Sequence, residues 1–248
     1  MPALADHFSG HAEAYAAYRP GYPAALVEAL AAASPARERA WDVGCGSGQL
    51  SVQLAAAFRE VVATDAFERP IREARPHPRV AYRVAPAEAS GLPAASCDLL
   101  VAAQAAHWFD LPAFYAEARR VARSGALLAL VTYGLHQVDP DLDEVVRRFY
   151  GETVGAYWPP ERRHIEDGYA SLPFPFPAVA LPPCAMSARW TLPELLGYVR
   201  TWSATQRAVK VLGEPVLRPF EAEMTRGWGD PAARREVRWP LAVRAGRL

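Results

Sequence analysis

Residues Trp41–Ser51, with the sequence WDVGCGSGQLS, have the composition and spacing of a ligand-binding turn. Glycines at positions 44, 46 and 48 follow a short apolar run, and an apolar pattern at helical spacing starts at Leu50. Glycine admits positive φ and lacks the Cβ atom that would hold a ligand away from the backbone, while the first turn of a helix leaves N–H donors unpaired. The stretch therefore predicts a strand, a glycine loop and a helix N-terminus that bind a nucleotide-like group.

The glycine spacing and an acid further along the chain narrow the choice of ligand. A dinucleotide site has the pattern G-x-G-x-x-G, whereas here Gly48 comes one residue early and Gln49 takes the place of the last glycine. Asp65 ends the apolar run 61–65, and an acid at the end of the second strand of such a unit can accept hydrogen bonds from ribose hydroxyls. These features favour a ribose-bearing ligand without a pyrophosphate and disfavour a nicotinamide oxidoreductase. An ordinary tight turn followed by a solvated aspartate is the alternative.

At these positions the sequence resembles the class I S-adenosylmethionine-dependent methyltransferases. Their first motif, an acidic residue followed by G-x-G-x-G, is matched by Asp42, Gly44, Gly46 and Gly48, and their ribose-binding acid is matched by Asp65. The resemblance implies S-adenosyl-L-methionine as the cofactor. The predicted cofactor-binding residues are Tyr15, Arg19, Asp42, Gly44, Cys45, Gly46, Gly48, Gln49, Asp65, Ala66, Ala87, Glu88 and Gln104.

Several of these assignments rest on the family pattern and have structural alternatives. Tyr15 and Arg19 match a Y-x-x-x-R-P-x-Y-P segment, part of an aromatic-rich stretch that would close over the cofactor. The arginine would bind the methionyl carboxylate as a planar fork; a surface ion pair is its alternative. Ala87 and Glu88 would meet the adenine, unless Glu88 is a plain loop carboxylate. Gln104 ends a predicted strand where the methionine moiety is expected.

The turn at residues 104–108 decides which acceptor the resemblance implies. It reads QAAHW and lacks the N/D-P-P-Y type of turn that holds a flipped base, which argues against methylation of nucleic acid amines. His107 and Trp108 match instead a small-molecule branch, methyltransferase type 11, that includes trans-aconitate methyltransferase-like proteins. The resemblance implies a small-molecule acceptor, with His107 nominated as the catalytic base and Trp108, Tyr133 and Trp202 as substrate residues. A structural role for these side chains is the alternative.

The resemblance leans towards a small carboxylic acid as acceptor. An acid would need an arginine near the methyl group, because a guanidinium pairs with a carboxylate through two parallel hydrogen bonds. The candidates are Arg162, Arg163, Arg200 and Arg207. No metal is predicted, because only Asp110 offers an oxygen ligand near the turn, whereas metal-dependent transfer to vicinal diols needs several. A noncatalytic protein that binds or senses S-adenosylmethionine remains the alternative to an enzyme.

The order of apolar runs predicts an α/β fold. Strands expected at 61–65, 79–85, 97–104 and 126–132 alternate with helices, which gives parallel strands, right-handed crossovers and a ligand site at the carboxyl edge. Gly125 is expected to end the helix before the fifth strand. We predict a Rossmann-like, seven-stranded, mostly parallel sheet with an antiparallel last strand and a helical cap.

One methyltransferase domain is expected over residues 1–248. Its cofactor-binding half covers 35–135, a cap and substrate region covers 136–230, and a closing edge strand lies within 231–248, while residues 1–30 add to the cap. A chain of 248 residues has little room for two full domains.

Charge and cysteine content limit the kinds of partner that the protein is expected to have. Lys+Arg and Asp+Glu both number 27, so the net charge is zero and no overall field attracts nucleic acid or an anionic membrane. The 3 cysteines are widely spaced, which predicts neither a disulfide framework nor a zinc pair. No apolar run reaches the roughly 18 residues of a membrane span. We expect a cytoplasmic protein with a small-molecule partner, and its oligomeric state is open.

Overall fold

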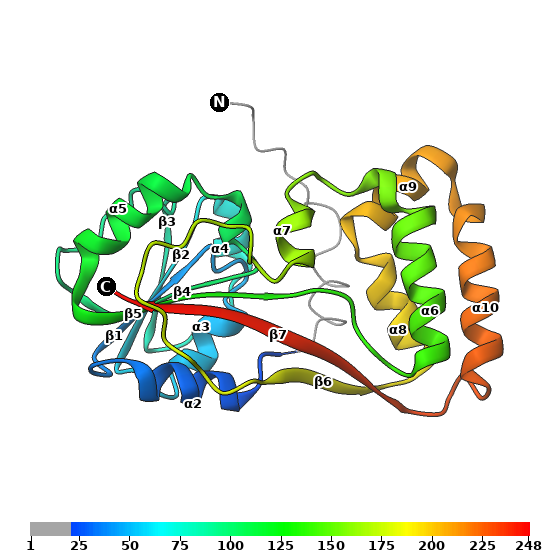
Figure 1. Ribbon diagram of the computed structural model, residues 1–248, viewed down its shortest axis with the longest axis horizontal. Coiled ribbons are helices and arrows are strands. Elements are labelled where there is room, and N and C mark those ends of the chain that lie inside the picture. Colours follow the sequence, from blue (N-terminus) through cyan, green and yellow to red (C-terminus); the bar gives the residue numbers. More distant parts are fainter. Residues whose placement is uncertain (1–20) are drawn as a thin grey trace. The chain divides into compact units, whose positions relative to one another are not determined.

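The computed structural model describes residues 21–248, which divide into two compact units whose elements are labelled in Figure 1. The sheet unit comprises residues 21–134, 161–186 and 240–248. The described part of the helical unit comprises residues 135–160 and 187–239. Residues 161–186, predicted as part of the cap region, therefore belong with the sheet, and so does helix α2 (Ala24–Ala33), which the prediction had placed in the cap.

Seven strands form one sheet in the order β3-β2-β1-β4-β5-β7-β6. Their bounds are β1 (Arg39–Val43), β2 (Glu60–Asp65), β3 (Val80–Val84), β4 (Cys97–Ala103), β5 (Ala122–Tyr133), β6 (Ala185–Trp190) and β7 (Arg235–Arg247). The first five strands pair in parallel, and β7 runs antiparallel to β5. The predicted mostly parallel sheet with an antiparallel last strand is confirmed.

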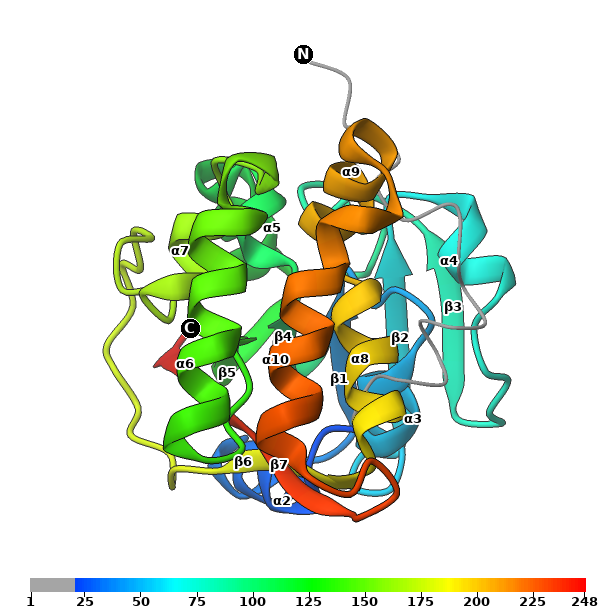
Figure 2. The same cartoon turned by 90° about the vertical axis from the view of Figure 1, so that its right-hand side faces the viewer.

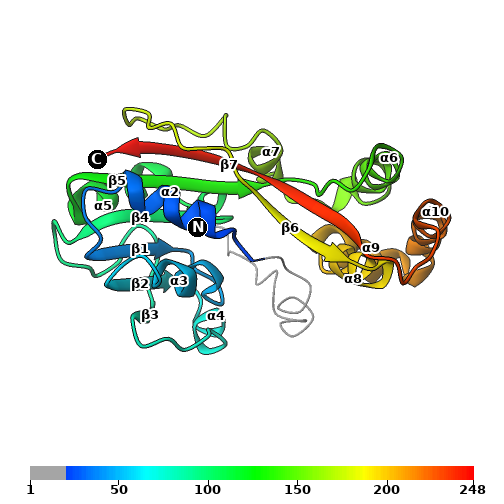
Figure 3. The same ribbon diagram turned by 90° about the horizontal axis from the view of Figure 1, so that it is seen from below.

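The alternation of side chains along the strands gives the sheet two buried faces. On one face Trp41 and Leu100 pack with Phe114 and Val121 of α5 (Leu111–Val121) in the main core. On the other face α2 packs against β5, and α3 (Gln49–Leu54) packs against β1 and β2 (Figure 3). The remaining helical segments of this unit are α4 (Glu68–Arg72), the turn η1 (Ala106–Trp108) and α7 (Arg162–Glu166). Covered on both faces, the parallel strands leave their carboxyl ends as the place where loops gather.

Gly125 is not the helix stop that its position predicted. Helix α5 ends at Val121 and β5 begins at the next residue, so Gly125 lies within the strand. The register of β4 against β5 shifts between Cys97 and Leu99, whose partners are Ala122 and Leu127. Gly125 has φ of 76° inside this irregular stretch. A bulge, which places extra residues opposite one partner and favours glycine at positive φ, explains the residue.

The C-terminal strand is also not the edge strand that was predicted. β7 lies between β5 and β6, and β6 takes the edge. Residues Leu241–Arg247 pair with β5, while Leu241 N donates to Cys184 O on the opposite side. A strand of 13 residues offers backbone groups on both sides, and here both sides are used.

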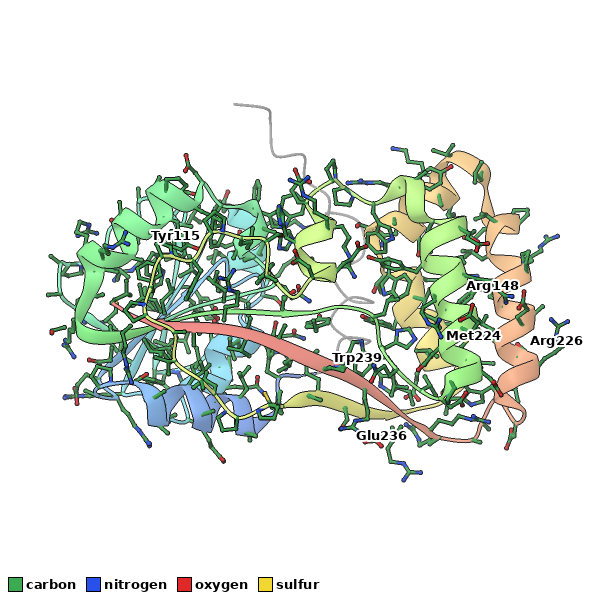
Figure 4. All side chains as sticks on the ribbon, viewed as in Figure 1. Tyr115, Arg148, Met224, Arg226, Glu236 and Trp239 are labelled. Atoms are coloured by element: carbon green, nitrogen blue, oxygen red, sulfur yellow. The ribbon has the colours of Figure 1, made fainter. Side chains whose placement is uncertain are left out.

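The helical unit contains α6 (Pro140–Arg148), α8 (Leu192–Arg200), α9 (Ser203–Leu212) and α10 (Arg218–Trp228), with the short turns η2 (Phe149–Thr153), η3 (Gly155–Tyr157) and η4 (Glu214–Leu217). Figure 2 shows α6, α10 and α8 packed side by side. Asp139 caps α6 by accepting a hydrogen bond from Leu142 N, and Thr191 and Glu194 form a capping box at α8. Met224 is fully buried, and Arg148 pairs with Glu223 between α6 and α10 (Figure 4). Among residues 21–248, no helix is both long enough and apolar enough to cross a membrane.

Candidate active site

The glycine loop between β1 and α3 adopts the conformation for which its sequence is suited. Gly44, Gly46 and Gly48 have φ of 67°, 55° and 77°, the left-handed region that disfavours any residue with a Cβ atom. Cys45 N donates to Thr64 O at 2.9 Å, which ties the loop to β2. The loop is thus fixed at the carboxyl end of β1, beside the end of β2.

The three glycines have different surroundings. A Cβ atom on Gly44 would lie 2.6 Å from the Cβ of Ala105, and one on Gly48 would lie 2.7 Å from a ring carbon of Tyr82. A Cβ atom on Gly46 would meet no atom of the described residues within 4 Å. Gly44 and Gly48 therefore also allow close packing of the protein itself, whereas Gly46 borders open space.

Asp42 is a buried carboxyl group directly behind the loop. It is 1% exposed, and Ser51 Oγ of α3 donates to its Oδ2 at 2.6 Å. Burial raises the pKa of Asp42 to about 7; the charge of Asp65 adds to the rise, and the hydrogen bond from Ser51 opposes it. The carboxyl group therefore sits close to half-protonated at neutral pH.

Asp65 links the end of β2 to the glycine loop. Its Oδ2 accepts from Gly46 N and its Oδ1 accepts from Phe67 N, each at 3.0 Å. Burial raises the pKa of Asp65, and the two backbone hydrogen bonds counteract this rise. Each oxygen keeps a further lone pair, so the carboxylate can still accept hydrogen bonds from a diol.

Other predicted cofactor residues lie around this loop. Cys45 is half-buried, and burial raises the pKa of its thiol. Gln49 begins α3 and is half-buried, while Ala66 follows β2 and is exposed. Tyr15 and Arg19 lie outside the described residues and stay predictions.

The segment after β3 connects to the start of α5. Ala87 is buried, and Glu88 is half-buried with its Oε1 accepting from Asp110 N at 2.9 Å. Asp110 is in turn the N-cap of α5. The carboxylate of Glu88 thus has a structural partner, and its role towards an adenine stays a prediction.

Gln104 joins the ends of β4 and β5. Its backbone has φ of 57°, and its side chain donates from Nε2 to Tyr133 O at 2.9 Å and accepts at Oε1 from Thr132 Oγ1 at 2.8 Å. Tyr133 itself is 6% exposed. The amide therefore locks the two strand ends together.

His107 faces a tyrosine that the sequence did not single out. Its Nδ1 lies 2.8 Å from the hydroxyl of Tyr169, and its ring packs against Trp108 with centroids 4.8 Å apart. Burial lowers the pKa of His107 to about 3, and the charges of Arg162 and His164 contribute. The nomination of His107 as base assumed an ordinary imidazole pKa; burial lowers that pKa, and the catalytic role of His107 stays a prediction.

Tyr169 could not be found by local pattern. It is fully buried and has φ of 67°, a conformation uncommon for a residue with a bulky side chain. Strained backbone that the surroundings hold in place is frequent at functional sites. The segment after α7 brings it to the turn η1, and no spacing in the sequence signals that contact.

The remaining substrate candidates fall in different units. Trp202 belongs to the helical unit, apart from the sheet unit that holds Trp108 and Tyr133. Of the four arginines predicted as partners for an acceptor carboxylate, Arg200 forms ion pairs with both Glu214 and Glu221.

The other three arginines also have defined positions. Arg207 donates to Tyr157 O within the helical unit. Arg162 and Arg163 lie on α7 in the sheet unit, where Arg162 is half-buried and Arg163 is exposed. Within residues 21–248, no three His, Cys, Asp or Glu side chains are grouped so that they could hold a metal ion.

Comparison with known proteins places this arrangement in a family. Residues 41–130, which contain the glycine loop, Asp65 and the turn η1, match the model of a methyltransferase domain. A Dictyostelium discoideum protein named as a methyltransferase is 32% identical over 227 residues, which are 90% of this chain and 86% of that protein. A methyltransferase of Mycobacterium tuberculosis that is named as uncharacterized is 32% identical over 173 residues, 69% of this chain and 66% of that protein.

A solved structure, described as a type II methyltransferase from Anaeromyxobacter dehalogenans, is also similar to this chain. It is 51% identical with a TM-score of 0.89, and the match covers 93% of this chain and 98% of that chain. The narrower resemblance to trans-aconitate methyltransferase-like proteins stays a prediction. The sequence relatives and this structural match show that the chain belongs to the class I S-adenosylmethionine-dependent methyltransferases.

Proposed function

We propose that this methyltransferase binds S-adenosyl-L-methionine at the glycine loop and methylates a small carboxylic acid. The observation that carries the first half is the bond between Asp65 and Gly46 N, which orients a carboxylate with spare lone pairs beside the open face of Gly46. A ribose diol matches those acceptors. Asp42, held by Ser51 behind the loop, keeps the loop and α3 in register.

The backbone at Gly46 is open to a ligand. Among residues 21–248, no atom lies within 4 Å of where a Cβ on Gly46 would point, so a ligand can approach the backbone there. When bound, the cofactor supplies a sulfonium whose methyl group is open to attack by a nucleophile. Trp108 and Tyr133 are the candidates for aromatic contact with that cation and with the acceptor.

The described residues favour an acceptor that needs no general base. With a pKa of about 3, the imidazole of His107 is neutral at pH 7 and a weak base. A carboxylic acid is already ionised at that pH and is nucleophilic as it stands, whereas a phenol or an ammonium group must first lose a proton. We assign His107 to orienting the acceptor through a hydrogen bond, with its tautomer set by Tyr169.

The first expected result concerns the cofactor. Asp65→Ala removes the acceptor for ribose hydroxyls and for Gly46 N, so the affinity for S-adenosylhomocysteine should fall by a factor of about 10 to 100, from about 1.5–3 kcal/mol for hydrogen bonds to a charged group. Isothermal calorimetry measures this. Glu73→Ala, which removes a carboxylate from an exposed helix pair with Arg69, is the matched control and should bind normally. Unchanged affinity of Asp65→Ala would refute the assignment.

The second expected result concerns His107. Because burial keeps its pKa near 3, its imidazole nitrogens should show no titration between pH 5 and pH 8 in nitrogen-detected NMR. The imidazole signals that disappear in the His107→Gln variant are assigned to His107. A titration centred near pH 6.5 would restore His107 as a candidate base and would favour a phenol or an amine as acceptor.

The third expected result concerns the binding of the acceptor carboxylate. Arg162 is half-buried on α7, and its charge helps to lower the pKa of His107, which supports it as the partner of an acceptor carboxylate near the turn η1. Arg162→Gln should raise the KM for acid acceptors by a factor of about 10 to 100 while leaving cofactor affinity intact. Arg163→Gln changes the exposed neighbour and should have little effect.

A panel of small acids, phenols and amines tests the class of acceptor directly. Methyl transfer to acids alone supports the full proposal. Transfer to neutral phenols or amines alone overturns the acid while leaving the methyltransferase in place. Tight binding of S-adenosylhomocysteine without turnover on any class would instead favour a noncatalytic binding or sensing protein.

A further inference from the structure

A buried imidazole in the helical unit has no hydrogen-bond partner among residues 21–248. His136 is 2% exposed, and neither Nδ1 nor Nε2 makes a hydrogen bond. Burial alone lowers its pKa to about 3, so it is neutral, with one nitrogen a donor and the other an acceptor. Buried polar groups are nearly always paired, because leaving them unpaired costs stability. The unpaired imidazole of His136 therefore points to a hydrogen-bond partner that is a bound ligand.

The position of His136 is fixed by the backbone. It follows the end of β5, and the next residue, Gln137, exchanges two hydrogen bonds of 2.8 Å with Arg238 of β7. These backbone hydrogen bonds hold the segment in place, so an unfixed backbone does not explain the unpaired imidazole.

Aromatic rings surround the imidazole. The ring centroids of Tyr198, Trp202 and Trp239 lie 5.6, 5.9 and 6.0 Å from that of His136. Trp239, labelled on β7 in Figure 4, donates from Nε1 to the hydroxyl of Tyr198 at 3.1 Å. The face of a ring can accept from an imidazole N–H, but it cannot donate to the other nitrogen. At least the lone-pair nitrogen of His136 therefore needs a donor that these rings do not supply.

The cluster extends towards the outside of the helical unit. Trp202 contacts Tyr150 and Trp158, each with a centroid distance of 5.9 Å, and both of these rings are half-buried. Thr205 lies in the first turn of α9, three positions after the N-cap residue Trp202, and its buried hydroxyl also has no partner among the described residues. Aromatic surface thus runs continuously from half-exposed rings to the buried polar atoms.

We propose that His136, Tyr198, Trp202 and Trp239 form a binding site for a flat aromatic group that carries a neutral hydroxyl or N–H donor. The rings would cover its faces, and the imidazole would accept its hydrogen bond. Among residues 21–248, burial is the one cause of the lowered pKa of His136, so the group that binds its imidazole is expected to be neutral at that point. This binding does not depend on the proposed function.

Two probes of equal shape test the site on the full chain. Binding of 4-fluorophenol and 4-fluorotoluene is followed by fluorine NMR, with the nitrogen signals of His136 recorded alongside. The phenol should bind about tenfold more tightly than the toluene, as one neutral hydrogen bond in a buried site predicts. One imidazole nitrogen of His136 should shift on phenol binding and not on toluene binding. Equal affinities, or an unmoved nitrogen signal, would overturn the proposal.

Substitution at the site gives a second readout. His136→Phe keeps the ring and removes both unpaired nitrogens, so it should raise the melting temperature and abolish the preference for the phenol. His77→Phe, on the loop before β3, is the matched control and should keep the preference. A preference that survives in His136→Phe contradicts the site. The wild-type nitrogen shifts decide the question if that variant does not fold.

The two proposals fail separately. S-adenosylhomocysteine affinity and methyl transfer are measured without the probes, and probe binding is measured without the cofactor. Loss of phenol selectivity with intact methyl transfer removes only the site at His136, whereas phenol selectivity without methyl transfer removes only the proposed function.

Discussion

Gly48→Ala is expected to lower the free energy of unfolding by about 2–5 kcal/mol and to reduce S-adenosylhomocysteine binding by more than about 100-fold. The residue has φ of 77°, which costs about 1–2 kcal/mol for a side chain with a Cβ atom. The new methyl group would also lie 2.7 Å from the ring of Tyr82, and overpacking of this kind costs about 1–3 kcal/mol. Relief of the clash moves either the Tyr82 side chain or the loop that carries Gly46.

A matched glycine separates the two contributions. Gly91 has φ of 68° and no atom within 4 Å of an added Cβ, so Gly91→Ala should cost only the conformational part and leave cofactor binding unchanged. The double variant Gly48→Ala, Tyr82→Ala should cost less than the sum of the two single changes, because it removes the clash. Urea unfolding and calorimetry measure both effects. Equal losses in Gly48→Ala and Gly91→Ala would show that Tyr82 does not press on the loop.

The part of the site that the sequence predicted is the part built from neighbours in the chain. Gly44, Gly46 and Gly48 sit in one turn between β1 and α3, so their spacing alone fixes a left-handed path. Asp65 is close because β1 and β2 pair side by side in register, as consecutive parallel strands often do. Alternating apolar runs and short connections likewise predicted that the first five strands are parallel, although they did not predict the order of the strands in the sheet.

What the sequence could not supply depends on contacts between distant segments. Tyr169 reaches His107 only because residues 161–186 pack with the sheet unit, and the buried setting of His107 follows from that contact. The same packing brings α7, which carries Arg162, into contact with the turn η1, and Arg200, equally plausible from the sequence, forms ion pairs with two glutamates in the helical unit. Burial and pairing of charges are tertiary properties, and the residue type alone does not reveal them.

The errors at Gly125 and at β7 have a similar origin. A glycine after an amphipathic helix usually marks the helix end, but here the register of β4 and β5 required extra residues inside a strand. The sequence predicts a strand near 179–189 beside the closing strand 235–243, and only the sheet order β5-β7-β6 shows that the former, not the latter, takes the edge. Strand character is local, whereas position in a sheet is not.

Asp42→Asn should make the protein more stable at neutral pH, by an amount that grows as the pH rises. The folded-state pKa of Asp42 is about 7, above the ordinary value of 3.8, so the folded state holds a proton that the unfolded state has lost. The stability that this proton provides is complete below pH 4 and is lost as the pH rises to about 7. The loss is on the order of 4 kcal/mol, at 1.36 kcal/mol for each unit of pKa difference. An asparagine keeps the shape and does not ionise.

Urea unfolding of both proteins from pH 4 to pH 8 measures the effect. The two should have similar stability at pH 4, and the variant should lead by a few kcal/mol at pH 8. Ser51→Ala tests the cause: it removes a hydrogen bond that lowers the pKa of Asp42, so stability should fall with pH over a wider range than in the wild type. Parallel curves for wild type and Asp42→Asn would mean that Asp42 ionises at an ordinary pH. In that case the carboxyl group behind the glycine loop would be charged throughout, and the hydrogen bond from Ser51 would outweigh the cost of its burial.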